Sequence, residues 1–149
     1  MTEYSFAAEA TSTATPDAVF ALLADATRWK EWAGPFIRES SWEREGTPPP
    51  GGVGAIKRLG GRPIYSREET VEYDPPRRYA YVILSGQPVT RYRSVVELTP
   101  VDGGTGTHIR WASTFEPKVA ATGPFMRWYL SKIIAGFARR LAAHAGRAS

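Results

Sequence analysis

Residues 122–146, TGPFMRWYLSKIIAGFARRLAAHAG, decide the fold, because they carry the one long helical pattern in the sequence. Apolar side chains recur at steps of four and three, which places them on a single stripe of a 3.6-residue helix. The stripe consists of Met126, Leu130, Ile133, Phe137 and Leu141. At 1.5 Å per residue such a helix would be roughly 35 Å long. We therefore expect it to cross a small sheet, and the functional question is what lies between sheet and helix.

Size and composition indicate a single globular domain over residues 1–149. Hydrophobic residues make up 42% and aromatic residues 12% of the chain, which are values of globular proteins and not of disordered ones. There is no cysteine, which excludes disulfides and thiolate chemistry and fits a cytoplasmic location. The first twenty residues lack the pattern of a signal peptide, and no run of apolar residues is long enough for a membrane-spanning helix.

Charge and histidine placement argue against several classes of partner. The net charge is +4, but 19 basic residues are interleaved with 15 acidic ones, so we expect a solvated surface and no nucleic-acid partner. His108 and His144 lie far apart, and neither has metal-ligand spacing to another histidine, so no metal site is expected. No phosphate-binding or nucleophile-elbow motif occurs, and no cofactor is predicted.

The chain before the long helix begins with a strand and two short helices. Residues 3–11 alternate, with Tyr4, Phe6, Ala8 and Ala10 on one face. Thr15 and Pro16 then predict the start of a helix, because threonine caps helices and proline suits the first helical position. A second short helical piece carries Arg28, Trp29 and Trp32 and ends at Gly34-Pro35.

From residue 36 the hydrophobic period changes to two, which predicts six further strands. Their connections are short and rich in glycine and proline, a pattern that favours antiparallel pairing. A separate helix set beside an antiparallel sheet defines an α+β domain. The predicted strands are residues 36–45, 53–59, 64–73, 78–84, 91–99 and 105–115.

Three segments and the long terminal helix resemble one family. The segments are TPDAVFALLADATRWKEW (15–32), REETVEYDPPRRYAY (67–81) and RYRSVVELTPVDGGTGTHIRW (91–111). The order and spacing of Pro16, Asp25, Trp32, the Asp-Pro-Pro turn and the Gly-Thr before the last strand are similar to the START-like, Bet v 1-like superfamily (SRPBCC), and more narrowly to its polyketide cyclase/dehydrase group.

The resemblance implies a helix-grip fold, in which a curved seven-stranded antiparallel sheet wraps around the long C-terminal helix and encloses a cavity. Two short helices follow the first strand in this fold. Family members bind lipids, sterols, polyketides and plant hormones, and a minority catalyse cyclisation or dehydration. A fold shared by so many functions does not identify the reaction or the ligand.

Strand alternation predicts which side chains face the cavity. On the strand of residues 64–73, we place Tyr65, Arg67, Glu69, Val71 and Tyr73 inward, because this set is the more apolar one. With the inward residues of the later strands and the helix stripe, the predicted ligand-binding residues are Tyr65, Arg67, Glu69, Tyr81, Tyr92, Ser94, Trp111, Met126, Leu130, Ile133 and Phe137.

Two alternatives remain open for this set. A charge buried without a partner is very unfavourable, so Glu69 should meet an arginine, a tyrosine hydroxyl or water. Alternatively, Glu69 and Arg67 form a structural pair at the rim of the sheet. Each tyrosine, and Trp111, could equally be ordinary core with a satisfied polar atom.

Three classes of function follow. The first is an intracellular carrier or sensor, monomeric or homodimeric, for a small hydrophobic ligand such as a lipid, polyketide or isoprenoid. The second is a cyclase or dehydratase in which Glu69 is the general acid or base and Arg67 or Tyr81 stabilises an enolate. The third is a protein-interaction module with a vestigial cavity smaller than roughly 300 Å³.

Overall fold

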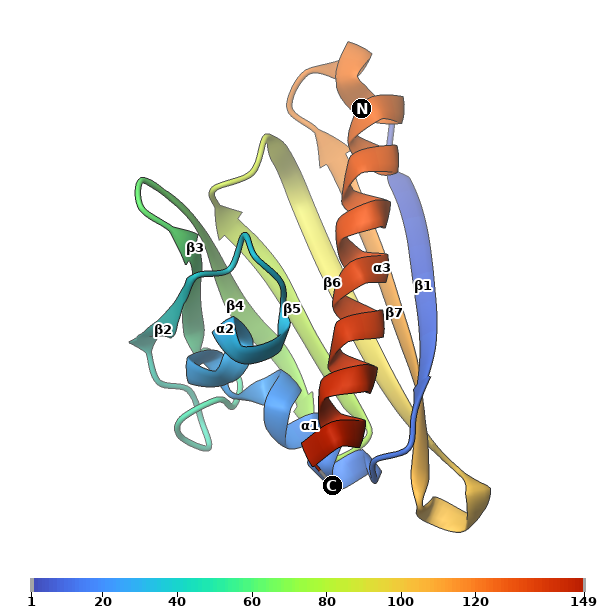
Figure 1. Cartoon of the computed structure of the whole chain (residues 1–149). Helices are drawn as coiled ribbons and strands as arrows, with labels where there is room; N and C mark the ends of the chain where they lie inside the picture. Colours follow the sequence, from blue (N-terminus) through green and yellow to red (C-terminus); the bar gives the residue numbers. More distant parts are fainter. Residues whose placement is uncertain (1, 149) are drawn as a thin grey trace.

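A seven-stranded antiparallel sheet forms the body of the molecule in the computed structural model, which describes residues 2–148. The strand order across the sheet is β1-β7-β6-β5-β4-β3-β2, so the first strand pairs with the last. The sheet curves around one long helix (Figure 1), and the predicted helix-grip fold is confirmed. The strands are β1 (Tyr4–Ser12), β2 (Glu39–Arg44), β3 (Ile56–Gly61), β4 (Ile64–Asp74), β5 (Arg78–Ser85), β6 (Val89–Val101) and β7 (Gly106–Pro117).

β2 and β3 begin later than the strands predicted at residues 36–45 and 53–59. The segment before β2 turns back on itself, because Ile37 N–H donates to the Gly34 carbonyl over 3.1 Å. Residues 33–38 therefore form a loop that continues from α2 across the open side of the sheet (Figure 1). This loop carries Phe36, the most exposed of the large apolar side chains.

Two short helices follow β1, as predicted. They are α1 (Pro16–Ala24) and α2 (Trp29–Trp32), joined by a 3₁₀ turn over Ala26–Arg28. The Ala18 N–H donates to Thr15 Oγ1 over 3.3 Å, and Pro16 occupies the first turn, which confirms the predicted start of the helix. No helix within residues 2–148 has the length and apolar character needed to span a membrane.

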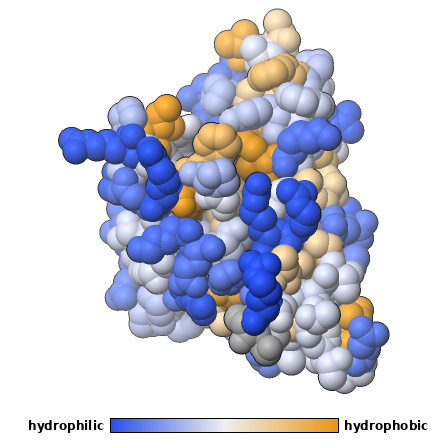
Figure 2. Space-filling model, viewed as in Figure 1, coloured by the Kyte–Doolittle hydropathy of each residue, from blue (hydrophilic) through white to orange (hydrophobic). Residues whose placement is uncertain are grey.

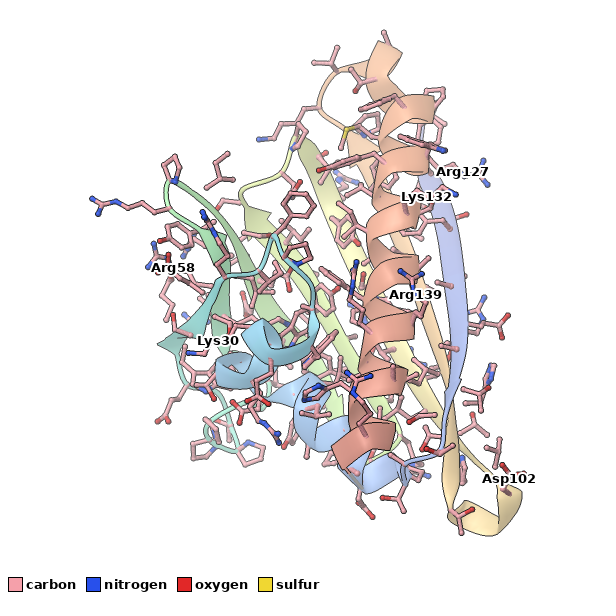
Figure 3. All side chains as sticks on the ribbon, viewed as in Figure 1. Lys30, Arg58, Asp102, Arg127, Lys132 and Arg139 are labelled. Atoms are coloured by element: carbon pink, nitrogen blue, oxygen red, sulfur yellow. The ribbon has the colours of Figure 1, made fainter. Side chains whose placement is uncertain are left out.

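The long helix α3 (Gly123–Ala148) lies along β1 and β7 (Figure 1). It is fastened to β1 near both of its ends. Arg127 Nε donates to the Ser5 carbonyl over 3.0 Å (Figure 3), and Ser12 Oγ donates to the Ala142 carbonyl over 2.7 Å. The helix therefore covers the β1 side of the concave face and leaves the β3–β5 side to other elements.

The buried stripe of α3 is rotated slightly from the predicted one. Ile134 and Ala138 are buried, whereas Ile133 and Phe137 are half-buried at the edge of the stripe. The reason is that the helix packs on β1 and β7 rather than centrally on the sheet. The fully buried stripe is Met126, Leu130, Ile134, Ala138, Leu141 and Ala145.

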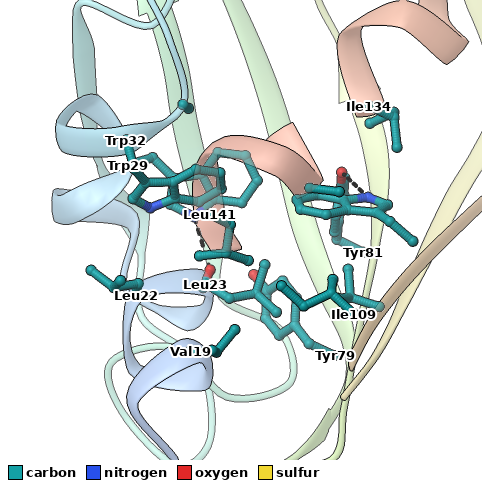
Figure 4. Close-up of a cluster of buried hydrophobic side chains, with 14 of the residues drawn as sticks. Val19, Leu22, Leu23, Trp29, Trp32, Tyr79, Tyr81, Ile109, Ile134 and Leu141 are labelled. Carbon is teal, nitrogen blue, oxygen red and sulfur yellow. Dashed lines mark hydrogen bonds between the residues drawn. The ribbon is translucent and has the colours of Figure 1, made fainter. Parts of the chain in front are cut away.

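The hydrophobic core fills the end of the concave face next to α1 (Figure 4). Trp29 is at its centre and is fully buried, and its Nε1 donates to the Leu23 carbonyl over 2.8 Å. The Trp29 ring meets the rings of Trp111 and Phe137 edge-on, with centroids 5.9 and 5.5 Å away. Because these large rings crowd one end of the sheet, the other end remains for a cavity.

The candidate ligand cavity

A cavity of about 790 Å³ lies between the concave face of the sheet and α3. Its position follows from the off-centre helix, because the space between α3 and strands β3–β5 is bordered by residues 33–38, by the β3–β4 turn and by Gln87 of the β5–β6 turn. The volume lies within the roughly 300–1,000 Å³ usual for small-molecule sites, so the cavity is larger than the vestigial one considered above. Its apolar walls are formed by Leu59, Ile83, Leu130, Ile133, Ile134 and Phe137.

Three predicted site residues on β4 lie on the opposite, outer face of the sheet. Tyr65 donates its hydroxyl proton to Glu39 Oε2 over 2.9 Å. Arg67 makes a two-bonded pair with Glu43, and Glu69 Oε2 lies 3.7 Å from Arg44. The prediction that Tyr65, Arg67 and Glu69 face the cavity is therefore wrong, and so is the alternative in which Glu69 pairs with Arg67.

Two features of β4 explain this error: its inward face is polar at the start of the strand, and a β-bulge interrupts the alternation. The inward face of β4 begins with Ser66, Glu68 and Thr70, which are polar, and the strand register shifts between Thr70 and Glu72. After this bulge the odd-numbered Tyr73 points inward, and its ring centroid lies 5.5 Å from that of Phe20. Tyr73 therefore made its alternating set appear to be the apolar one, although the first half of that set faces outward.

The buried carboxylate of the site is Glu68. It lines the cavity and faces Lys57, its direct partner in the pairing of β3 with β4. Lys57 Nζ and Glu68 Oε1 are 3.2 Å apart, and the side chains are only 2% and 7% exposed. The sequence contained a signal for this pair, because Lys57 is two residues from the buried Leu59 and therefore shares its face. A buried ammonium group needs a carboxylate nearby.

Lys57 is held in a cage of aromatic rings. Its Nζ lies 4.2 Å from the ring centroid of Tyr81, 4.7 Å from that of Trp29 and 4.9 Å from that of Tyr79. It also donates to the Tyr79 hydroxyl over 2.9 Å. Burial by itself lowers the pKa of Lys57, but Tyr79 and Glu68 outweigh that effect and raise it. Lys57 is therefore a fixed positive charge directly behind Glu68.

Glu68 is a buried carboxyl group in the wall of the cavity. Burial raises the pKa of its carboxyl group, against the opposing charge of Lys57. Despite its proximity to Lys57, Oε1 accepts no hydrogen bond from any residue of the described chain, and Ser66 Oγ is likewise buried without a partner there. Both residues line the cavity. The charge of Glu68 is offset by Lys57, 3.2 Å away, so Glu68 brings a charge-compensated carboxyl group to the cavity wall.

Two tyrosines line the cavity, as predicted, and each is held by a hydrogen bond from behind. Trp111 Nε1 donates to the Tyr81 hydroxyl over 3.3 Å, and Tyr92 donates to Ser113 Oγ over 3.2 Å. Ser94 Oγ in turn donates to the Tyr92 hydroxyl over 3.2 Å. Burial raises the pKa of Tyr92 to about 12 and that of Tyr81 well above its ordinary value, so both remain neutral phenols at physiological pH.

The structure divides the predicted ligand-binding residues into three groups. Tyr81, Tyr92, Leu130, Ile133 and Phe137 line the cavity. Ser94, Trp111 and Met126 are buried but do not reach it; Ser94 and Trp111 position the tyrosines instead. The third group is the outward-facing set on β4 described above. Among residues 2–148, no three His, Asp or Glu side chains come close enough together to hold a metal ion.

The sequence matches a protein family along nearly its whole length. The family is described as "polyketide cyclase / dehydrase and lipid transport", and its model matches residues 3–146. The chain belongs to this family. No curated protein matches the sequence.

Solved structures share the polyketide cyclase / dehydrase fold with this chain. A START superfamily protein from Mycobacterium smegmatis has a TM-score of 0.81 and 12% identity, covering 97% of this chain and 99% of that one. An uncharacterized protein from Bacillus thuringiensis has a TM-score of 0.76 and 20% identity, with the same coverage. A protein from Nitrosospira multiformis has a TM-score of 0.70 and 19% identity, covering 95% of each chain. At these identities the likeness is one of fold.

Proposed function

We propose that the protein binds a small, mostly hydrophobic molecule in the cavity under α3 and acts as its carrier or sensor. The observation that carries the proposal is a cavity of about 790 Å³ with largely apolar walls, which a single carboxyl group among residues 2–148, that of Glu68, lines. An apolar cavity with a few convergent polar groups is typical of small-molecule sites. The lipid transport named in the family description supports the same class of ligand.

The ligand's inner end should carry a hydrogen-bond donor such as a hydroxyl group. The Glu68 carboxyl group, which lines the cavity, is the acceptor for that bond, and Ser66 lies beside it on the same strand face. The hydroxyl groups of Tyr81 and Tyr92 already have protein partners, so they shape the wall more than they select the ligand. Lys57 stays behind Glu68 and does not line the cavity.

One observation favours an enzyme as the second candidate. The pKa of Glu68 is raised by burial, which is how proteins prepare a carboxyl group for general acid or base catalysis near neutral pH. In this candidate Glu68 takes the role predicted for Glu69, whose side chain lies on the outer face. A dehydratase or cyclase of this kind would lose turnover in Glu68→Gln while still binding its substrate.

Native mass spectrometry of the purified protein tests the binding function, followed by titration with a panel of fatty acids, isoprenoids and aromatic polyketides. Ile133→Trp should fill the cavity and abolish binding, because Ile133 lines its wall. Val119→Trp is the matched control, since Val119 is 61% exposed and does not line the cavity. A protein without co-purified ligand that also binds nothing in the panel would contradict the proposal.

The remaining expectations rest on composition and family resemblance. They are a cytoplasmic location, the absence of a cofactor and of a nucleic-acid partner, and a monomeric or homodimeric state. Size-exclusion chromatography with light scattering would decide the oligomeric state directly.

A further inference from the structure

Four basic side chains surround the mouth of the cavity. Two come from α3, one from the loop before β2 and one from the β3–β4 turn, so three separate parts of the chain contribute them. Figure 2 shows apolar surface in the middle of this side of the molecule, with hydrophilic side chains on both sides of it. The four residues are Arg38, Arg62, Lys132 and Arg140.

None of these four cations has a carboxylate partner within the described chain, although they lie close together around one opening. Among residues 2–148, no Asp or Glu oxygen lies within 4 Å of their charged nitrogens. By contrast, Arg67 and Arg78 on the outer face are both paired with glutamates. The one carboxylate that lines the cavity is Glu68, which is buried and already faces Lys57.

Arg140 packs its guanidinium group against two glycines. Its guanidinium lies against Gly34 and Gly136, and a Cβ atom at those positions would lie 2.9 and 2.8 Å from Nη1. Gly34 also has φ +110°, a conformation that other residues rarely adopt. The guanidinium is thus half-buried between two backbones, where its field is less screened than at an open surface.

We propose that the ligand is an anionic amphiphile whose charged head group lies at the mouth, between Arg140 and Lys132, with its apolar body inside the cavity. This proposal rests on the proposed binding function and adds the chemical class and the orientation of the ligand. Carboxylate, sulfate and phosphate head groups share the required chemistry, because each accepts hydrogen bonds from guanidinium and ammonium donors.

The charges at the two ends of the cavity fix the direction of binding. A negative head group gains from the four cations at the mouth, whereas at the inner end it would approach the Glu68 carboxyl group. At that end the Glu68 carboxyl group and the Lys57 ammonium group offset each other, so a buried anion would lose its hydration without gaining a free positive partner, which is unfavourable. A cationic ligand would meet the opposite pattern and would be repelled at the mouth.

The test compares three ligands with the same hydrocarbon chain and different head groups: decanoate, decan-1-ol and decylammonium. Isothermal titration calorimetry at low ionic strength, below the micellar range, gives each dissociation constant. Decanoate should bind at least about tenfold more tightly than decan-1-ol, and decylammonium most weakly, because several cations act together. The advantage of decanoate should shrink as salt is added.

Charge reversal on α3 identifies the residues responsible. Lys132→Glu should weaken decanoate binding far more than decan-1-ol binding and so remove the preference, and Lys132→Gln should have a smaller effect in the same direction. Arg139→Glu makes the same charge change on the same helix (Figure 3), but Arg139 does not line the cavity and faces the groove beside β1. It should therefore alter decanoate binding little, apart from a weak long-range effect.

The outcomes distinguish the anionic head group from the proposed binding function on which it rests. If decan-1-ol binds as tightly as decanoate, or if Lys132→Glu and Arg139→Glu have equal effects, the anionic head group is wrong while the binding function stands. If none of the three ligands binds and the wider panel also fails, the binding function itself is wrong.

Discussion

Lys57 and Glu68 face each other directly across β3 and β4, with 3.2 Å between Nζ and Oε1, and both side chains are almost completely buried. Such a pair is costly to desolvate, and its net contribution to stability is often small compared with apolar residues of similar size. One member of the pair, Glu68, lines the cavity, so the pair places a buried charged group at the proposed site.

Replacing only Glu68 should destabilise the protein more than replacing both Lys57 and Glu68. Glu68→Leu leaves the Lys57 ammonium buried without its carboxylate and should lower the free energy of unfolding by about 3 kcal/mol at pH 7. Lys57→Met should cost less, because the remaining carboxyl group, whose pKa burial already raises, can take up a proton. The double variant should be more stable than Glu68→Leu. Urea denaturation measures all three, and strictly additive losses would show that the pair is not coupled.

Neighbouring glutamates on β4 should differ completely in their effect on binding. Glu68→Gln should weaken binding of a hydroxyl-bearing ligand roughly tenfold, since a neutral amide oxygen accepts a weaker hydrogen bond than a carboxylate and the amide NH2 cannot accept one at all. Glu69→Gln should leave the affinity unchanged, because Glu69 lies on the outer face near Arg44. The same titration serves both variants, and an equal loss in both would show that the strand register described above is wrong.

Removing each of the two cavity tyrosine hydroxyls should have unequal effects on stability. Tyr81→Phe leaves the buried Trp111 N–H without an acceptor and should cost about 2 kcal/mol. Tyr92→Phe should cost about 1 kcal/mol, because Ser94 and Ser113 still bond to each other over 2.6 Å. Thermal or urea unfolding tests the order, and a larger loss in Tyr92→Phe would contradict it.

Glu72 on the outer face should make a pH-dependent contribution to stability. A hydrogen bond from Arg78, with the nearby charge of Arg93, lowers its pKa below the usual 4.5. Because the folded-state pKa is the lower one, the stabilisation is present above about pH 4.5 and is lost as the pH falls through the folded-state value.

The expected size is at most about 1 kcal/mol, since the Glu72 side chain is 34% exposed and solvent screens the pair. The difference in unfolding free energy between the wild type and Glu72→Gln should therefore shrink from pH 6 to pH 3 and also with added salt. A difference independent of pH would rule out this assignment.

The fold could be predicted from the sequence because its signals were redundant. The stripe on the last helix, the cap at Thr15 and the short turns between alternating strands all indicated the same architecture. On β5, β6 and β7 the inward faces were also predicted correctly, since large side chains such as Tyr81, Tyr92 and Trp111 dominate them. Where burial and hydropathy agree, alternation identifies the inward face.

The site could be predicted only in part, because the residues that make it distinctive break that agreement. Glu68 and Lys57 are charged and buried, and the bulge after Thr70 moves Tyr73 into the opposite set. The cations at the mouth were missed for a different reason. Arg38 and Arg140 are 102 positions apart in the sequence, and only the folded chain brings them to one opening.

The attachment of α3 to β1 near both ends of the helix determines where substitutions can be made without loosening the helix. Arg127 and Ser12 bond α3 to β1. These contacts involve neither the loop of residues 33–38 nor the β3–β4 turn. Those two segments line the cavity, so substitutions in them can change the shape of its opening without disturbing the contacts that hold α3 to β1. The shape of the opening and the stability of the fold can thus change independently.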